Sequence, residues 1–370
     1  MRIGVPKEIK SQEYRVGLTP ESVSELVADG HELWVETLAG AGIGAMDEDY
    51  LKAGAIIKVT AAEIFEACDM IVKVKEPQAA ERAMLRPGQI LYTYLHLAPD
   101  PEQTKELIDS GAVCIAYETV TDESGELPLL KPMSQVAGRL ATQVGATALQ
   151  KLGGGRGTLL GGVPGVSSGK VVIIGGGDVG YNAALMAIGL QADVTILERS
   201  NKVMEKLSYE FGNRAQVRRS TPDVLAKLLR SADLVIGAVL IPGAAAPKLI
   251  TREMLSLMKE GSVLVDVAID QGGCFETSKP TTHAKPTYIV DGVVHYCVAN
   301  MPGAVARTSA YALNAATLHY AKRIANKGWK EAMRDDPHLL NGLNVCEGKL
   351  TYKAVADAQG LDWVEPASVL

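Results

Sequence analysis

Three glycines and one acid in the middle of the chain have residue types and a spacing that can do chemistry. Gly175, Gly177 and Gly180 stand in VVIIGGGDVGYNAA, between a strand-like run and a helical run. Glycines so placed make a tight turn, let the backbone approach a pyrophosphate and let a helix pack closely. Glu198 ends the next strand-like run, where a carboxylate can bind both ribose hydroxyls and repel a 2′-phosphate. The order of these elements favours a dinucleotide over a merely flexible turn and predicts NAD, with the adjacent Arg199 leaving NADP open.

Further cofactor contacts are expected at the carboxyl ends of the later strands, because open α/β sheets bind ligands there. Together with Asp178 and Val179 of the glycine motif, the predicted cofactor residues are Val239, Leu240, Val267, Ala268, Ile269, Asp270, Val298, Asn300 and Met301. Each of the strand-end residues fits an ordinary strand-to-helix connection equally well. Pro242 and Gly243 fit a loop at the rim of the site.

Three cationic or titratable side chains in the first third each follow a strand-like run. Arg15 stands in EYRVGLTP, Lys75 in MIVKVKEP and His96 in ILYTYLHLAP. Arginine can grip a carboxylate bidentately, lysine can polarise a carbonyl, and histidine titrates near neutral pH. Taken singly, such residues are more often solvated charges or structural histidines. Converging opposite a nicotinamide, they would suit a small 2-oxo or 2-amino acid.

The elements that must position these three side chains alternate between strand and helix up to about residue 128. A βα alternation predicts a parallel sheet wrapped by helices. The expected strands are 2–6, 31–37, 55–59, 70–76, 89–96 and 113–119, and the expected helices are 20–30, 61–67 and 100–111. In the last helix, Asp100 before Pro101 indicates the start and Gly111 the end.

A second alternation carries the glycine motif. Its expected strands are 170–175, 193–198, 215–220, 234–240 and 262–269. Long helices at 132–152 and 304–327 flank it, and a turn-rich connector follows the first of them at 152–170.

We therefore expect an α/β protein with two Rossmann-like doubly wound domains. An NAD domain at 130–305 is inserted into a substrate domain formed by 1–129 and 306–370, whose tail is too short for a core of its own. We expect a cleft between the domains, which close over the substrate about hinges near Pro132 and Ala304.

Composition excludes several classes. The 370 residues suffice for two to three domains, and hydrophobic residues at 47% with charged residues at 22% indicate a globular chain. A net charge of −6 offers no general attraction to nucleic acid or to an anionic membrane. Five dispersed cysteines without a C-x-x-C pair favour reduced thiols in the cytoplasm. No export signal, membrane span or His/Cys metal cluster is expected.

Several motifs, in order over essentially the whole chain, resemble the alanine dehydrogenase family. They are MRIGVPKEIKSQEYRVGLTP, VKVKEP, YLHLAP, KPMSQVAGRLA, VVIIGGGDVGYNAA, VDVAIDQGGCFET and VANMPGAVARTSAYALNAAT. The resemblance implies NAD-dependent, reversible oxidative deamination of L-alanine to pyruvate and ammonia, in a subunit that is usually part of a homohexamer.

The resemblance also implies roles for single residues. Arg15 and Lys75 would bind the substrate, and His96 and Asp270 would do the acid and base chemistry. The residues implied near NAD are Ser134, Glu198, Ser220, Lys279 and Asn300. Position 198 is commonly Asp in the family and position 279 often Arg, so the residues here keep the charge but leave cofactor affinity open.

Three alternatives stay open at this point. A transhydrogenase-like NAD(H)-binding subunit would need a partner and a second nucleotide site. A non-catalytic NAD-binding protein would lack the intact set of Arg15, Lys75, His96 and Asp270. A dehydrogenase for a larger amino acid, such as saccharopine, differs in pocket volume rather than in residue types.

Overall fold

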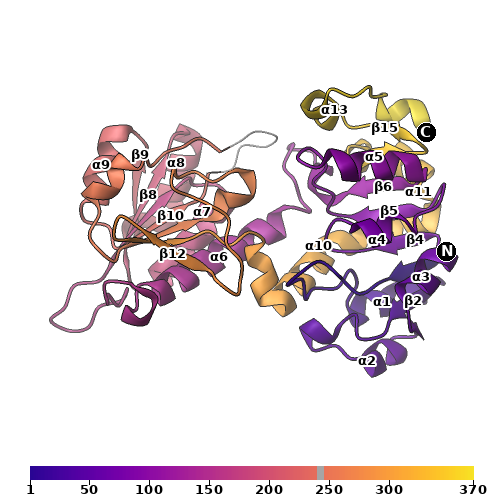
Figure 1. Cartoon of the computed structure of the whole chain (residues 1–370), viewed down its shortest axis with the longest axis horizontal. Coiled ribbons are helices and arrows are strands. Elements are labelled where there is room, and N and C mark those ends of the chain that lie inside the picture. The colour runs from indigo at the N-terminus through magenta and orange to yellow at the C-terminus, as the bar shows by residue number, and fades with distance from the viewer. Residues whose placement is uncertain (240–245) are drawn as a thin grey trace. The chain divides into compact units, whose positions relative to one another are not determined.

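Two α/β units make up the chain, and the sequence of the second lies within that of the first (Figure 1). The computed structural model describes residues 1–239 and 246–370. Unit 1 comprises Met1–Met133 and Val305–Leu370, and unit 2 comprises Ser134–Ala304. The expectation of an α/β fold with one domain nested in the sequence of the other is confirmed.

Unit 1 is built on an eight-stranded sheet with the order β15-β14-β6-β5-β4-β1-β2-β3. Its first six strands are parallel and follow the 3-2-1-4-5-6 order of a Rossmann sheet. The strands are β1 (Arg2–Val5), β2 (Glu32–Glu36), β3 (Ile56–Lys58), β4 (Met70–Val72), β5 (Ile90–Thr93), β6 (Val113–Ala116), β14 (Leu343–Cys346) and β15 (Lys349–Leu350).

The C-terminal tail returns to unit 1, as expected, but it also extends the sheet. β14 pairs antiparallel with β6, and β15 pairs antiparallel with β14. The parallel sheet predicted for the first 128 residues is confirmed, and the tail adds an antiparallel edge to it. The two strands were missed because each is short and lacks the long apolar run of a central strand.

Local signals mark both ends of α5 in unit 1. In α5, the Asp100 side chain accepts a hydrogen bond from the Gln103 N–H, Pro101 follows it, and Gly111 ends the helix with φ +68°. The helices are α1 (Pro20–Ala28), α2 (Asp47–Lys52), α3 (Ala61–Ala67), α4 (Ala79–Arg82), α5 (Pro101–Ser110), α10 (Ala306–Lys327), α11 (Trp329–Asp335), α12 (Pro337–Leu340) and α13 (Lys353–Gln359).

Unit 2 has a seven-stranded sheet with the order β12-β13-β11-β10-β7-β8-β9. Without β12, it repeats the order 3-2-1-4-5-6, all parallel, and β12 pairs antiparallel with β13. The strands are β7 (Lys170–Ile174), β8 (Asp193–Glu198), β9 (Gln216–Arg219), β10 (Leu234–Gly237), β11 (Val263–Asp266), β12 (Thr287–Val290) and β13 (Val293–Tyr296). The helices are α6 (Lys131–Ala148), which starts in the last residues of unit 1, α7 (Asp178–Gly189), α8 (Asn201–Phe211) and α9 (Pro222–Leu229).

Two features of unit 2 differ from the sequence expectation. The run expected as a strand over 262–269 ends at Asp266 and continues as a 3₁₀ turn, η6 (Val267–Gln271). The hairpin β12–β13 was not predicted, although the Asp-Gly pair between its strands is a typical hairpin turn sequence. Asp291 and Gly292 have φ +48° and +79°, the positive values that this turn requires.

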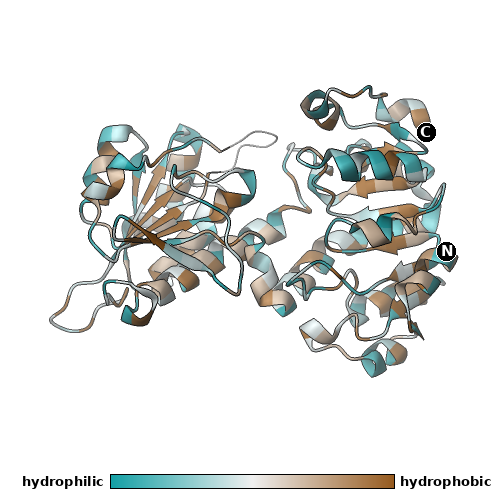
Figure 2. Cartoon of the chain, in the orientation of Figure 1, coloured by the Kyte–Doolittle hydropathy of each residue, from teal (hydrophilic) through white to brown (hydrophobic). Residues whose placement is uncertain are grey.

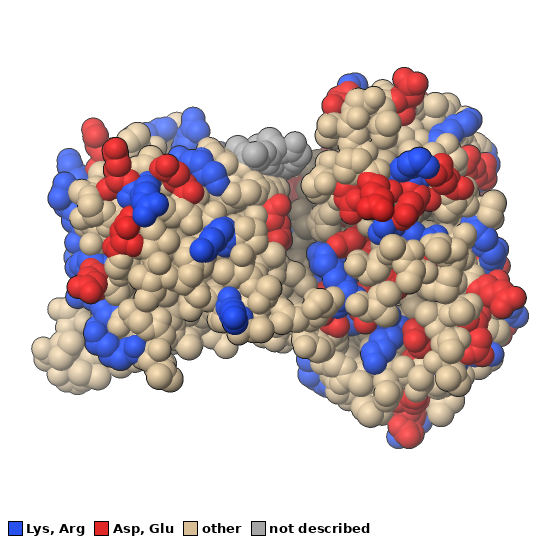
Figure 3. Space-filling view, viewed as in Figure 1, with Lys and Arg blue, Asp and Glu red and all other residues tan. Residues whose placement is uncertain are grey.

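Apolar strands form the centre of each unit, and Figure 2 shows them as the brown layer. In Figure 3, basic and acidic side chains intermingle on the visible face of both units, so neither charge dominates a unit there. All five cysteines are buried, and none of them is in a disulfide. Within the described ranges, every helix is too short or too polar to cross a membrane.

Candidate functional site

A pocket of about 430 Å³ lies in unit 2 at the carboxyl ends of β7, β8 and β10. Its volume is in the usual range for small-molecule sites, and the strand order reverses between β7 and β10, where Rossmann sheets bind dinucleotides. Eight residues that the sequence assigns to the cofactor line it together, namely Ser134, Gly175, Gly177, Asp178, Val179, Glu198, Ser220 and Val239.

The glycines at this pocket differ in what a side chain would meet. A Cβ on Gly180 would lie 1.8 Å from the carbonyl oxygen of Gly175, and Gly175 has φ +103°. A Cβ on Gly177 would meet no described atom within 4 Å. Among the described side chains, none caps α7 at Gly177, so the N–H groups of its first turn can meet an anion. The loop fits a pyrophosphate at Gly177 and close helix packing at Gly180.

Glu198 is held by backbone N–H groups at the edge of the same pocket. Its Oε2 accepts a hydrogen bond from the Gly176 N–H at 2.7 Å, and its Oε1 accepts from the N–H groups of Arg199 at 2.6 Å and Ser200 at 2.9 Å. The carboxylate is therefore fixed beside the glycine loop, where the ribose of a dinucleotide fits.

The other predicted cofactor residues that the structure describes are not part of the lining of this pocket. Val267, Ala268, Ile269 and Asp270 form most of η6, in which Asp270 is exposed. Lys279 is exposed, and its ammonium lies 4.5 Å from the centre of the Tyr288 ring. Val298 and Met301 are buried, and Asn300 has φ +60°. Leu240, with Pro242 and Gly243, lies outside the described residues.

Sequence reasoning missed the group that organises the segment after β11. Asp266 is fully buried. Its Oδ1 accepts a hydrogen bond from the Ala268 N–H at 3.1 Å, and its Oδ2 accepts from the Cys274 N–H at 2.9 Å and from the Ser278 hydroxyl. One carboxylate thus closes the loop that carries Asp270. Its signal in the sequence was a lone acid in the apolar run SVLVDVAI.

In unit 1, Arg15 is paired with Glu13. Arg15 is buried, and its Nε and Nη2 donate to the two oxygens of Glu13 at 2.7 and 2.6 Å, while Nη1 lies 3.1 Å from the sulfur of Met133. Burial acts to lower the pKa of Arg15, but the bonds to Glu13 raise it overall. The guanidinium is charged and oriented, with its Nε/Nη2 edge taken by Glu13.

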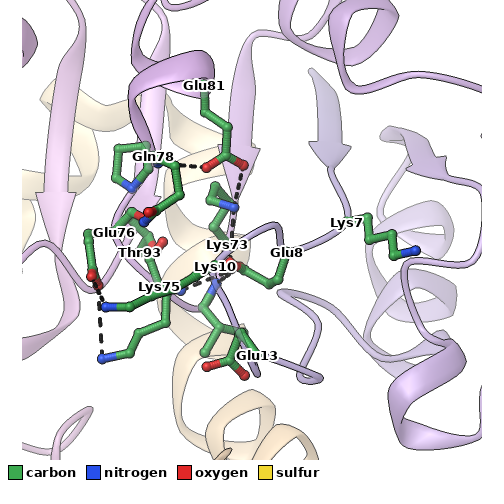
Figure 4. A network of polar contacts seen from close by, with 12 residues as sticks. Lys7, Glu8, Lys10, Glu13, Lys73, Lys75, Glu76, Gln78, Glu81 and Thr93 are labelled. Carbon is green, nitrogen blue, oxygen red and sulfur yellow. Dashed lines mark hydrogen bonds and ion pairs between the residues drawn. The ribbon is translucent and has the colours of Figure 1, made fainter. Parts of the chain in front are cut away.

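Lys75 follows β4 in a segment surrounded by charges, shown in Figure 4. Lys73 is fully buried, and its ammonium contacts Glu8 at 3.1 Å and Glu81 at 2.6 Å. Burial raises the pKa of Glu8 despite the opposing charge of Lys73. For Lys73, the two carboxylates outweigh burial and raise the pKa.

The Lys75 ammonium itself faces a carboxylate. It lies 3.9 Å from Oε2 of Glu76, whose Oε1 contacts Lys10. Figure 4 shows both lysines directed toward Glu76. Burial would raise the pKa of Glu76, but Lys75 and Lys10 lower it overall. Glu76 is therefore an ionised partner of the Lys75 ammonium.

His96 follows β5 and is exposed, with the left-handed φ of +52° that non-glycine residues rarely adopt. The Glu118 carboxylate accepts hydrogen bonds from the N–H groups of Leu95 at 3.0 Å and His96 at 2.6 Å. The His96 ring stacks on Tyr94 with centroids 5.9 Å apart. The expectation that His96 follows a strand end is confirmed, and Glu118 is a second carboxylate that sequence reasoning missed.

Arg15, Lys75 and His96 all follow carboxyl ends of strands in the unit 1 sheet, where ligand sites of such sheets form. In residues 1–239 and 246–370, no group of three or more His, Cys, Asp or Glu side chains could hold a metal ion.

Two family models together cover most of the chain. The alanine dehydrogenase/PNT N-terminal domain matches residues 4–137, and the alanine dehydrogenase/PNT C-terminal domain matches residues 141–353. An alanine dehydrogenase of Halomonas elongata is 60% identical over 370 residues, and one of Methanococcus maripaludis is 53% identical over 371 residues. Both alignments cover 100% of this chain and 100% of the relative.

Solved structures agree with these matches. A structure of L-alanine dehydrogenase superimposes with a TM-score of 0.95 at 50% identity, covering 97% of this chain and 99% of that chain. The transhydrogenase from Sinorhizobium meliloti has a TM-score of 0.84 at 25% identity, covering 95% and 100%. Because the chain is more than 50% identical in sequence to alanine dehydrogenases over its full length and shares their fold, it belongs to the alanine dehydrogenase family.

Proposed function

We propose that the chain catalyses the reversible oxidative deamination of L-alanine to pyruvate and ammonia with NAD. One observation carries the proposal: a chain that matches alanine dehydrogenases from end to end has a dinucleotide pocket in unit 2 and the oriented cations Arg15 and Lys75 in unit 1.

We propose that unit 2 binds NAD through the lining of its pocket. The N–H groups at the start of α7 fit the pyrophosphate beside Gly177, and Glu198 fits the ribose hydroxyls. Ser134 and Ser220 lie in the same lining and can add hydrogen bonds. Lys279, Asn300 and the η6 residues would complete the site toward the nicotinamide. Bound NAD supplies the acceptor for the hydride that leaves the alanine Cα.

We propose that Arg15 and Lys75 hold the alanine carboxylate. Glu13 holds the Nε/Nη2 edge of Arg15 and so orients the guanidinium that would bind the substrate carboxylate. Lys75 adds an ammonium group, which lies 3.9 Å from Oε2 of Glu76. Holding the substrate in a reactive orientation can contribute up to about 7 to 11 kcal/mol to lowering the barrier.

We propose that His96 moves the protons. Loss of hydride from Cα leaves an iminium group, to which water must add before ammonia can depart. His96 would take a proton from the attacking water and later give one to the leaving nitrogen. Its exposure, and the Glu118 hydrogen bonds that fix its backbone, suit this exchange. Asp270 would orient the water and stabilise the cationic iminium.

We further propose that the protein works in the cytoplasm as a homohexamer, with no nucleic acid or membrane partner. The rival of a transhydrogenase-like NAD(H)-binding subunit has the support of the 25% identical structure. That rival requires a partner protein and gives no role to the set of Lys75, His96 and Asp270.

The test is steady-state oxidation of NADH by purified protein with ammonium and a 2-oxo acid. We expect pyruvate to exceed glyoxylate and 2-oxobutyrate in kcat/KM, and NADPH to be a poor substitute for NADH. Hydride exchange between dinucleotides without turnover of pyruvate would favour the transhydrogenase-like rival. A preference for a large 2-oxo acid would favour a different amino-acid dehydrogenase.

A further inference from the structure

The Glu8 carboxylate joins two segments that are far apart in the sequence. Its Oε1 accepts hydrogen bonds from the N–H groups of Val74 at 2.7 Å and Lys75 at 3.3 Å. Its Oε2 accepts from the Lys73 ammonium at 3.1 Å. The Glu8 side chain is 2% exposed, so its polar atoms are committed to these contacts within the protein. Glu8 therefore holds the backbone that carries Lys75.

Neighbouring strands fix the carbonyl side of the same segment. The Tyr117 hydroxyl donates to the Lys73 carbonyl at 2.9 Å, and the Thr93 hydroxyl donates to the Lys75 carbonyl at 2.9 Å. These hydroxyls come from the ends of β5 and β6, whereas Glu8 follows β1. Glu8 is thus a direct restraint between the Lys75 backbone and the N-terminal segment.

That N-terminal segment also carries Arg15. Glu13 pairs with Arg15, and Lys10 contacts Glu76, so the stretch from residue 8 to residue 15 meets the stretch from 73 to 76 at more than one point. Figure 4 shows Glu8, Lys10 and Glu13 along one side of the Lys73–Glu76 segment. The spacing between Arg15 and Lys75 depends on how these two stretches are held together.

We propose that Glu8 is a positioning residue, which sets the place of Lys75 relative to Arg15 and so controls the affinity for the 2-oxo acid. This inference rests on the proposed substrate role of Lys75. Displacing a binding group by about 1 Å can cost up to about a hundredfold in activity.

Glu81 provides a matched control. Like Glu8, its side chain is 2% exposed and it pairs with the Lys73 ammonium. Its other contact is with the Gln78 N–H at 2.8 Å, not with Val74 or Lys75. Removing either acid leaves one carboxylate for one ammonium. Glu8→Ala and Glu81→Ala therefore make similar changes in charge and volume, but only Glu8→Ala removes the acceptor of the Val74 and Lys75 N–H groups.

The experiment measures KM for pyruvate, kcat, NADH affinity by fluorescence and the unfolding midpoint. We expect Glu8→Ala to raise KM about tenfold or more, with a smaller change in kcat, and Glu81→Ala to change KM less than about twofold. NADH affinity should stay at the wild-type value in both variants. Glu8→Gln retains an oxygen that can accept from Val74 and Lys75, so it should restore most of the lost affinity for pyruvate.

Equal increases in KM for Glu8→Ala and Glu81→Ala would overturn the inference, since the effect would then follow the shared ion pair. Should Glu8→Ala fail to fold, Glu8→Asp replaces it, because the shorter side chain keeps the charge but draws the carboxylate away; an unchanged KM there would also overturn the inference.

Lys75→Gln separates this inference from the proposed function. If it leaves KM for pyruvate unchanged, the substrate role of Lys75 is wrong and the inference is overturned with it. If Lys75→Gln raises KM while the two alanine variants behave alike, the proposed function stands and only the role of Glu8 is overturned.

Discussion

Units 1 and 2 share a strand order but hold their candidate site residues by different means. In unit 2, the pocket depends on glycines that allow close backbone packing: Gly175 has a positive φ, and Gly180 packs where a Cβ would collide with a carbonyl oxygen. In unit 1, the candidate residues depend on charge: Glu13 holds Arg15, Glu8 holds the backbone of Lys75, and Glu118 holds that of His96.

The difference suits what each unit is proposed to bind. A pyrophosphate needs backbone N–H groups at close range, and only glycine lets the chain come near enough. A small amino acid offers a carboxylate and an amino group, so its site needs oriented charges. Buried cations require partners because an unpaired buried charge is costly. The acids beside the unit 1 cations meet this requirement.

The largest effect expected from the comparison is on His96. His96→Ala should lower turnover roughly 10²- to 10⁴-fold, as loss of a general acid or base does, while NADH binding, assigned to unit 2, stays unchanged. His96→Asn tests the backbone, because asparagine tolerates the left-handed φ of +52° better than alanine does. Steady-state kinetics and NADH fluorescence measure the two properties.

The exposed His319 on α10 supplies a control, and His319→Ala should leave turnover unchanged. If both His96 variants kept more than about a tenth of wild-type turnover, the loss would fall short of that of a general acid or base. The proton carrier would then be another group, with Lys75 the first to examine.

In unit 2, a single methyl group should suffice to disturb the pocket. Gly180→Ala places a Cβ 1.8 Å from the Gly175 carbonyl oxygen, so the loop or α7 must move. We expect the free energy of unfolding to fall by about 1 to 3 kcal/mol, as overpacking typically causes, together with a clear loss of NADH affinity.

Gly189→Ala in the same helix is the matched control, because a Cβ there meets no described atom within 4 Å. This variant should be neutral or slightly more stable. Thermal unfolding and NADH titration of both variants provide the measurement. Wild-type NADH affinity in Gly180→Ala would show that the close approach does not shape the site.

The same contrast explains what the sequence could predict. The glycine motif, its flanking strand and helix, and Glu198 are close in the chain, and eight residues chosen from that pattern line one pocket. Glu8 and Val74 are 66 residues apart and meet only because β1 and β4 are neighbours in the sheet. The periodicity of apolar residues in the sequence does not show which acidic side chain such a strand pairing will bury.

Strand ends show a similar limit. The apolar runs 70–76 and 262–269 were expected to be strands throughout, but β4 ends at Val72 and β11 at Asp266. In both runs, a buried charged side chain lies at the end of the strand: Lys73 pairs with Glu8 and Glu81, and Asp266 accepts hydrogen bonds from the N–H groups of the following loop. The alternation predicted the sheets, whereas the loops that carry Lys75 and Asp270 depend on tertiary contacts.

The smallest predicted effect concerns His295, a fully buried histidine on β13 of unit 2. Burial lowers the pKa of His295, although Asp266 and Asp291 partly oppose the shift. The Thr277 hydroxyl lies 2.7 Å from its Nε2, and the Val293 carbonyl lies 3.0 Å from its Nδ1. The folded state therefore favours the neutral ring.

The unfolded chain takes up this proton near pH 6.5 and the folded one only at lower pH, so stability is full above about pH 6.5 and falls as the pH drops below it. The slope for one proton is at most about 1.4 kcal/mol per pH unit. Hydrogen exchange of peptides covering β11 and β13, corrected for intrinsic rates, should show weaker protection at pH 5.5 than at pH 7.5. His295→Gln cannot bind the proton and should show a smaller difference. Equal differences in the two proteins would assign this pH dependence to other groups.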